Sequence, residues 1–159
     1  MVFMRSFLYL LGGFVLFSIA ATFFLLPEHN KNSEKNTDEG VKFSFDITPK
    51  SATPNDTFWF VLSIVNHSDD TAKFLLPTPL PARFTVYRNG RPIWNSDYGM
   101  MFIQMITPFK VAPGDSIPLK SFWLGKDNSA KFQPLGKYIV EACFLGNKRC
   151  FKDSLWLVD

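Results

Sequence analysis

The sequence predicts an all-β protein, an antiparallel β-sandwich domain preceded by one N-terminal transmembrane helix. Three observations support this prediction. The chain holds 18 Phe and 4 Trp among its 159 residues, and aromatic side chains favour strands. Its 11 Pro and 9 Gly interrupt the apolar runs at short intervals, as turns between short strands require. After residue 28 no stretch has helical periodicity, whereas about eight or nine short apolar runs are separated by turns roughly every 8 to 12 residues.

The N-terminal part of the chain has the pattern of a membrane segment. Residues 7–26 are 20 consecutive uncharged residues, mostly Phe, Leu, Val, Ile, Ala and Gly. As a helix they would reach about 30 Å, the thickness of a bilayer's hydrocarbon core. Because Arg5 precedes the segment, the positive-inside rule puts the N-terminus in the cytoplasm and the remaining chain outside. We therefore expect a single-pass protein of the cell membrane with an extracytoplasmic domain.

A cleaved signal peptide is the alternative for this segment. The small residues Ser18 and Ala20 could form a cleavage site after the apolar stretch 7–17, and cleavage would give a secreted or periplasmic protein. We favour the anchor, because the length fits a membrane span better than a signal core. The next residues, 28–40, are almost wholly polar and should form a flexible tether. The expected organisation is therefore an anchor at 1–27, a tether at 28–40 and a β-sandwich domain at 41–159.

The first strands follow from alternation and from breaker residues. Residues 41–48 alternate apolar and polar side chains, which predicts a half-buried strand. Residues 57–65 are nearly all apolar, so we expect a central strand covered on both faces, by sheets or by a sheet and a loop. A short strand at 71–76 should end at the proline-rich stretch 77–81, which cannot join a ladder.

A hairpin lies at the middle of the domain. Asn-Gly at 89–90 separates two apolar runs, and this dipeptide is the strongest short-range hairpin signal. We expect strands at 84–88 and 92–95, and Pro92 should place one of them at a sheet edge, because proline lacks an amide donor. The apolar runs 98–106, where we expect strand alternation, and 109–111 lead to the turn at 112–115. Further strands are predicted at 115–124, 137–145 and 148–158, with a loop at 125–135 after the first of these.

The two cysteines lie in the last predicted hairpin. A two-residue turn at its tip sets Cys143 opposite Cys150 and Glu141 opposite Lys152. Because cross-strand side chains lie about 5 Å apart, a structural disulfide is predicted, with two free thiols as the alternative. A two-residue turn would make the cysteines a hydrogen-bonded pair, where the strands stand farther apart. A four-residue loop at 145–148 would keep the same register and relieve this.

The sequence offers no catalytic constellation. Its only histidines are His29, in the tether, and His67, in a polar turn beside Asp69 and Asp70, where turn geometry accounts for these residue types. There is no phosphate loop or dinucleotide fingerprint, and two His and two Cys so scattered do not make a zinc site. The net charge is +3 and the basic residues are dispersed, unlike those of a nucleic-acid binder. We predict no catalytic residue, cofactor, metal, small-molecule substrate or nucleic-acid partner.

An ordered series of residues gives the chain a family resemblance. It begins with an apolar run followed by Asn-x-Ser at 66–68, and continues with Trp-x-Ser-x-x-Gly-x-x-Phe-x-Gln at 94–104. Pro-Gly-Asp follows at 113–115, and Gly-x-Tyr-x-Val follows at 136–140. Over roughly residues 41–145 the chain resembles the BsuPI family, named for an intracellular proteinase inhibitor of Bacillus. The matching positions also include Phe84, Val86, Gly90, Val111 and Trp123.

The resemblance implies an immunoglobulin-like β-sandwich with a proteinase-inhibiting or protein-binding role. We expect a non-catalytic module whose binding surface lies within residues 94–105 and whose partner is a protease or another envelope protein. The candidate contact residues are Asn95, Ser96, Asp97, Tyr98, Met100 and Met101. Four aromatic residues of the pattern are expected in the core: Trp94, Phe102, Trp123 and Tyr138. The alternative is a structural or assembly module of the cell envelope without inhibitory activity.

Overall fold

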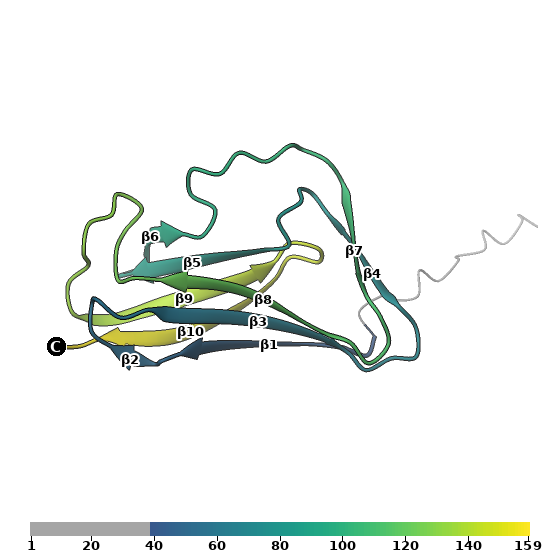
Figure 1. Ribbon diagram of the computed structural model, residues 1–159, viewed down its shortest axis with the longest axis horizontal. Helices are drawn as coiled ribbons and strands as arrows, with labels where there is room; N and C mark the ends of the chain where they lie inside the picture. Colours follow the sequence, from purple (N-terminus) through teal and green to yellow (C-terminus); the bar gives the residue numbers. More distant parts are fainter. Residues whose placement is uncertain (1–38) are drawn as a thin grey trace, which may run out of the picture. The chain divides into compact units, whose positions relative to one another are not determined.

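A computed structural model describes residues 39–159 (Figure 1). The predicted anchor at 1–27 and nearly all of the predicted tether at 28–40 lie outside these described residues. Within 39–159 the chain is all-β, and no helix there is long and apolar enough to cross a membrane.

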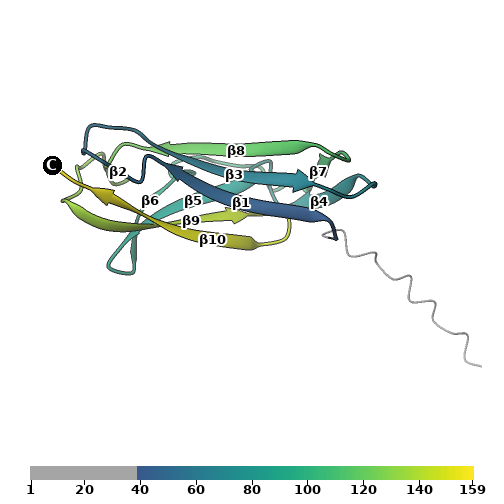
Figure 2. The same ribbon diagram turned by 90° about the horizontal axis from the view of Figure 1, so that it is seen from below.

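Two sheets form the body of the domain. The first contains β1 (Val41–Thr48), β3 (Phe58–Asn66) and β8 (Ser116–Trp123), with β3 in the centre and all neighbours antiparallel. The second has the order β2-β10-β9-β5-β6. Its strands are β2 (Ser51–Ala52), β10 (Arg149–Leu157), β9 (Gly136–Phe144), β5 (Ala82–Arg88) and β6 (Arg91–Asn95). Figure 2 shows the two sheets as layers, so the domain is a β-sandwich.

A separate two-stranded ribbon lies at one end of the sandwich (Figure 1). It consists of β4 (Ala72–Leu76) and β7 (Thr107–Val111), paired antiparallel. Its inner side chains continue the core, because the ring of Phe74 meets the ring of Phe144 edge-on at 5.0 Å. The ribbon therefore closes one end of the hydrophobic interior.

The core lies between the facing sides of the two sheets. Phe60 from β3 stacks on Phe84 from β5 with ring centroids 6.1 Å apart, and Trp123 from β8 packs on Tyr138 from β9 at 5.1 Å. Alternation decides which side chains enter it, since every second residue of a strand faces the same side. The residues of this core with the least exposure are Phe58, Phe60, Leu62, Ile64, Val86, Val111, Tyr138, Val140, Ala142, Phe144 and Leu155.

The alternating first strand and the central hairpin are confirmed. β1 has the predicted bounds, and its apolar face, which includes Val41 and Ile47, points to the core. Asn89 and Gly90 both have positive φ, at 50° and 75°, as a two-residue type I′ turn requires. Pro92 lies in β6, which is an edge strand of the five-stranded sheet, as predicted.

Two expectations about the strands are wrong, and one strand was not expected. β3 is not covered on both faces, because Trp59 on its second face is 50% exposed. Residues 98–106 do not form a strand, since the chain leaves β6 and runs without regular structure to β7. The unexpected strand is β2. It pairs in parallel with β10, a contact between residues about a hundred positions apart that no local pattern indicates.

Two of the family motifs meet at Asn66, a fully buried polar residue at the end of β3. Its side-chain amide donates to the carbonyls of Asp70 and Val111 at 2.8 and 2.9 Å. Its Oδ1 accepts bonds from the backbone N–H and the hydroxyl of Ser68 at 3.0 and 2.7 Å. The backbone of Asn66 also exchanges hydrogen bonds with Gly114 and Asp115. Asn-x-Ser and Pro-Gly-Asp are thus two halves of one buried hydrogen-bonded corner.

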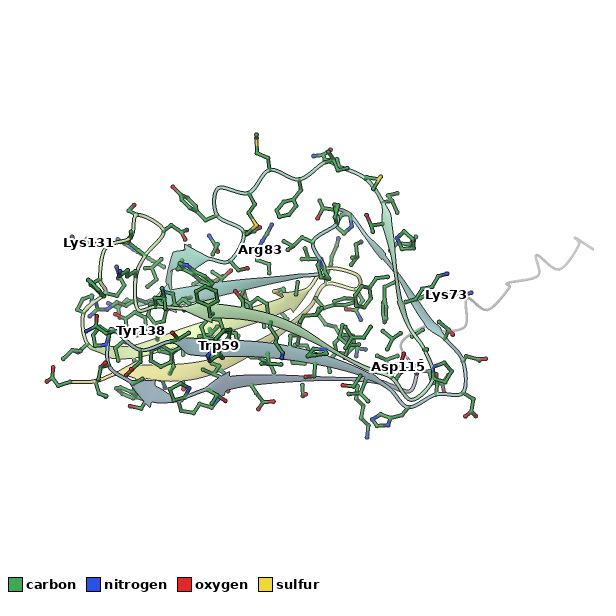
Figure 3. The ribbon with its side chains drawn as sticks, in the orientation of Figure 1. Trp59, Lys73, Arg83, Asp115, Lys131 and Tyr138 are labelled. Carbon is green, nitrogen blue, oxygen red and sulfur yellow. A yellow bond between two sulfur atoms is a disulfide. The ribbon has the colours of Figure 1, made fainter. Side chains whose placement is uncertain are left out.

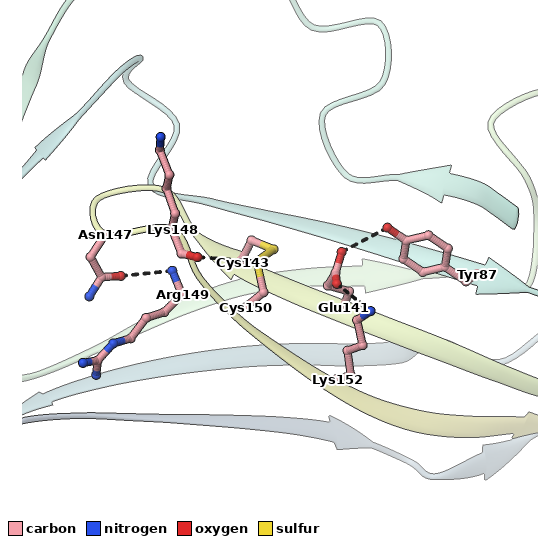
Figure 4. Close-up of a disulfide and its surroundings, with 8 residues drawn as sticks. All are labelled: Tyr87, Glu141, Cys143, Asn147, Lys148, Arg149, Cys150 and Lys152. Carbon is pink, nitrogen blue, oxygen red and sulfur yellow. Dashed lines mark hydrogen bonds and ion pairs between the residues drawn. A yellow bond between two sulfur atoms is a disulfide. The ribbon is translucent and has the colours of Figure 1, made fainter. Parts of the chain in front are cut away.

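The last hairpin carries a disulfide between Cys143 and Cys150 on the outer face of the five-stranded sheet (Figure 4). The two cysteines are direct cross-strand partners, and their Cα atoms are 4.1 Å apart. The connecting loop is the four-residue form at 145–148, not the two-residue turn. With this loop the two cysteines form a non-hydrogen-bonded pair, which accounts for the short distance between their Cα atoms. The neighbouring pair in the same register, Glu141 and Lys152, forms an ion pair at 3.1 Å.

Candidate functional site

Residues 96–106, here called the β6–β7 segment, form a long arch along the outside of the sandwich (Figures 1 and 3). The arch begins where β6 ends and stops where the β4–β7 ribbon begins. Most of its apolar side chains are exposed to solvent, and Met101 is 98% exposed. The exposed apolar residues of the segment are Tyr98, Met100, Met101, Ile103, Met105 and Ile106. Such a concentration of exposed apolar side chains is typical of an interaction site.

The start of the segment is held firmly to β5. The backbone N–H of Ser96 donates to the Phe84 carbonyl at 2.9 Å, and the Ser96 hydroxyl accepts from the Phe84 N–H at 3.0 Å. Next to it, Arg83 Nε donates to the Asp97 carboxylate at 2.7 Å. Because the Asp97 side chain is only 13% exposed, solvent screens this pair less than a free surface pair. The polar residues of the Trp-x-Ser motif therefore fix where the arch departs.

Two tight turns then lead the chain outward. The N–H of Tyr98 donates to the Asn95 carbonyl at 3.2 Å, and the N–H of Met100 donates to the Asp97 carbonyl at 3.1 Å. Gly99 between them has a φ of 75°, a conformation that glycine adopts without the steric cost of a side chain. The positive φ explains why the motif has glycine at position 99. The most exposed residue of the segment, Met101, follows directly after this turn.

A hollow of about 500 Å³ lies beside the first part of the segment. Tyr98 and Met100 form one side, the end of β8 forms another, and the loop at 125–135 completes it. The lining is mostly apolar, with Lys120, Lys126 and Asp127 as its charged members. The remaining lining residues are Trp94, Asn95, Ser96, Ser121, Phe122, Trp123, Leu124, Asn128 and Ala130.

The loop at 125–135 covers the open edge of β6. The N–H of Asn128 donates to the Ile93 carbonyl at 3.2 Å, and the Asn95 N–H donates to Asn128 Oδ1 at 3.1 Å. The loop itself is folded around Asp127, whose carboxylate accepts from the N–H groups of Ser129 and Lys131 at 2.9 and 3.0 Å. These contacts satisfy edge groups that would otherwise be open to pairing with another strand.

A second, smaller hollow of about 370 Å³ lies on the outer face of the five-stranded sheet, beside the disulfide. Tyr87 donates to Glu141 Oε1 at 3.0 Å there (Figure 4). Burial raises the pKa of Tyr87, and the hydrogen bond to Glu141 raises it further. A phenol that keeps its proton as a hydrogen-bond donor has a structural role here.

In the part of the chain that the structure describes, no group of three or more His, Cys, Asp or Glu could hold a metal ion.

The structure brings four of the six predicted contact residues to one hollow: Asn95, Ser96, Tyr98 and Met100. Asp97 is engaged by Arg83 instead, and Met101 projects into solvent. The polar residues at 95–97 position the segment, since their hydrogen bonds lie within the domain. The contribution of β8 and of the loop at 125–135 was not predicted, because it arises from contacts between distant parts of the chain.

Of the four residues expected in the core, three belong to it or pack on it and one does not. Trp123 and Tyr138 are fully buried. Trp94 is partly buried and packs on the core, with its ring 6.2 Å from that of Phe60. Phe102 departs from the expectation, because it is only partly buried and lies outside the core cluster. It sits in the β6–β7 segment, where the chain pairs with no strand and strand alternation does not apply.

Comparisons with known proteins identify a family and give weak structural likenesses. The alkylpurine DNA glycosylase AlkC of Pseudomonas fluorescens is 10% identical, with a TM-score of 0.48 over 76% of this chain and 31% of that protein. A β-glucosidase of Listeria innocua is 12% identical, with a TM-score of 0.44 over 74% of this chain and 16% of that protein. The sporulation control protein Spo0M of Bacillus subtilis is 6% identical, with a TM-score of 0.41 over 74% of this chain and 48% of that protein.

The chain thus spans less than half the length of each of these three proteins. No curated protein matches it. Residues 45–149, which include β2 to β9 and the whole β6–β7 segment, match the family described as BsuPI, intracellular proteinase inhibitor. This chain therefore belongs to the BsuPI family.

Proposed function

We propose that the domain is a non-catalytic module that binds and inhibits a proteinase through the β6–β7 segment. Membership of a proteinase-inhibitor family supports the choice of partner. The observation that carries the choice of surface is the row of exposed apolar side chains from Tyr98 to Ile106, mounted on a turn that Ser96 and Asp97 fix. An inhibitor gains affinity when its contact segment is ordered before binding, because less conformational entropy is lost.

The composition of the surface fits this role. Proteinase–inhibitor interfaces have an apolar centre with a polar rim. The β6–β7 segment supplies apolar and aromatic side chains, and Lys120, Lys126 and Asp127 border it at the hollow. Aromatic and Met residues are frequent anchors in such interfaces.

The proposal also covers where the protein is located in the cell and which type of β-sandwich it forms. Residues 7–26 would anchor the protein in the cell membrane as a single span, with the N-terminus in the cytoplasm and the domain outside it. The length of the uncharged stretch and Arg5 before it support this, and cleavage after residue 20, giving a secreted or periplasmic protein, is the alternative. The sandwich would be of the immunoglobulin-like type, which two antiparallel sheets around an aromatic core support.

Inhibition can be tested directly on the full chain in detergent micelles. Subtilisin, chymotrypsin and trypsin are titrated with the protein while hydrolysis of a chromogenic peptide is followed. The proposal predicts saturable, stoichiometric inhibition of at least one of these enzymes. The variant Tyr98→Ser/Ile103→Ser should weaken it by about 100-fold, as loss of two anchors would. Failure of the wild-type chain to inhibit any of the three would overturn the proposal.

A structural envelope module is the second candidate, and one observation favours it. Trp59 and Phe122 form an exposed ring pair, with centroids 5.5 Å apart, on the outer face of the three-stranded sheet. This pair lies on β3 and β8, away from the β6–β7 segment in sequence. Phe122 also lines the hollow beside the β6–β7 segment, whereas Trp59 does not. The control variant Trp59→Ser should therefore leave inhibition unchanged if the inhibitor proposal is correct. A wild-type chain that inhibits none of the three proteinases would favour the second candidate.

A further inference from the structure

Met101 has the highest exposure of the large apolar side chains that the structure describes, at 98%. It lies near the middle of the β6–β7 segment and is not part of the hollow that Tyr98 and Met100 line. Resting on the proposed function, we infer that Met101 is the specificity-determining residue of the inhibitor. In this assignment its side chain enters the primary specificity pocket, S1, of a serine proteinase whose pocket is deep and apolar.

The backbone on both sides of Met101 is held in place. Before it, the Met100 N–H donates to the Asp97 carbonyl at 3.1 Å, and Asp97 is itself bound by Arg83. After it, the Met105 N–H donates to the Ile103 carbonyl at 3.0 Å, and the Thr107 hydroxyl donates to the Met105 carbonyl at 3.1 Å. Met101 is therefore presented between two anchored stretches, as a residue that must reach into a pocket requires.

The chemistry of the segment selects an apolar pocket. Residues 98–106 carry no charged side chain. A pocket with an acidic residue at its base, as in trypsin, would be left with an unpaired buried charge by this segment, which is costly. Methionine is unbranched and polarizable, so it fills a narrow apolar pocket of irregular shape. Ile103 and Ile106 are also exposed, but their β-branched side chains are stiff and broad near the backbone.

A charge change at one position tests the inference, with a matched change on the same segment as control. Met101→Lys and Met105→Lys are compared with the wild type as full chains in detergent, and inhibition constants are measured for subtilisin, chymotrypsin and trypsin. Met105 is also exposed and gains the same charge. Met101→Lys should weaken inhibition of the two enzymes with apolar pockets by about 100-fold and strengthen inhibition of trypsin by at least about 10-fold. Met105→Lys places the same charge elsewhere on the binding segment, so it should weaken inhibition of all three enzymes without any gain against trypsin.

A conservative variant separates specificity from folding. Met101→Leu keeps an apolar side chain of similar volume, so inhibition of subtilisin or chymotrypsin should stay within about 5-fold of wild type. All variants should unfold at the wild-type temperature, because the side chain lies in solvent. If the wild type inhibits and Met101→Lys inhibits equally well, or Met105→Lys gains as much against trypsin, the inference is wrong while the proposed function stands. If the wild type inhibits none of the three enzymes, both fall.

Discussion

Trp123 and Tyr138 join the two sheets and also hold the loop beside the candidate site. Their ring centroids are 5.1 Å apart, one from β8 and one from β9. The Trp123 Nε1–H donates to the Lys126 carbonyl at 2.6 Å, and the Tyr138 hydroxyl donates to the Pro134 carbonyl. Burial raises the pKa of Tyr138, which keeps the phenol protonated as a donor. The loop at 125–135 is thus fixed at both ends by core residues.

Tyr138→Phe should lower the free energy of unfolding by about 1 to 2 kcal/mol, because it leaves the Pro134 carbonyl without its donor. Trp123→Ala should cost about 3 to 5 kcal/mol, because it also empties a large buried volume. Urea denaturation of both variants measures the difference. Equal losses in the two variants would mean that the ring packing contributes little beyond the hydrogen bonds.

Asn66→Ala should destabilise the domain by about 2 to 4 kcal/mol, because it removes the four side-chain hydrogen bonds to Ser68, Asp70 and Val111. Asn66→Asp is the matched control, since it keeps the acceptors for Ser68 but removes the donors to Asp70 and Val111. Thermal unfolding followed by circular dichroism compares the two. A near-neutral Asn66→Ala would contradict the role assigned to this corner.

Cys143→Ser/Cys150→Ser should lower the free energy of unfolding by about 2 to 3 kcal/mol in the chain-entropy account, for a sequence separation of 7. The wild-type chain in dithiothreitol should show the same loss, which identifies the cross-link as its cause. Urea denaturation in oxidising and reducing buffer makes the comparison. Inhibition should be retained, because the disulfide lies on the outer face of the five-stranded sheet and not on the β6–β7 segment.

The pair formed by Lys50 and Asp153 predicts a pH-dependent contribution to stability. Burial raises the pKa of Asp153, but the bonds from Lys50 and from the Ser154 N–H outweigh this and lower it below its ordinary value. A lowered folded-state pKa stabilises the fold above the unfolded pKa, and this is lost as the pH falls through the folded value. Both side chains are partly exposed, so the contribution is at most about 1 kcal/mol.

Asp153→Asn measures this contribution. The difference in stability between wild type and variant should be constant near pH 7 and should shrink below about pH 4, where the wild-type carboxyl becomes protonated. Lys50→Met should give a similar profile. A difference that grows on acidification would contradict the predicted direction of this pH dependence.

Local patterns predicted the elements whose partners lie nearby. The alternation at 41–48, the Asn89-Gly90 turn and the register that faces Cys143 with Cys150 need only neighbouring residues and appear as predicted. β2 was not predicted, because its two residues gain their structure from the distant β10. The exposure of Trp59 was not predicted either, because a continuous apolar run does not reveal which face lacks a covering layer.

The candidate site was predicted in part, for a similar reason. Tyr98 and Met101 could be named from the motif, but whether they face the core depends on the path of the segment outside the sheets. The expected roles of Asn95, Ser96 and Asp97 changed, because their partners Asn128, Phe84 and Arg83 come from the loop and from β5. Long-range contacts of this kind have no local signature in a single sequence.

Hydrogen–deuterium exchange of the full chain in detergent, free and bound to subtilisin, tests the central claim most directly. In the free protein the amides of residues 101–104 belong to no strand and lie between the hydrogen-bonded N–H groups of Met100 and Met105, so they should exchange quickly. The account predicts that binding slows exchange throughout 98–106 and at the adjoining loop around Lys126, with little change on the outer faces of the two sheets. Protection confined to the β1 and β3 strands of the face that carries Trp59, with none in the β6–β7 segment, would contradict it.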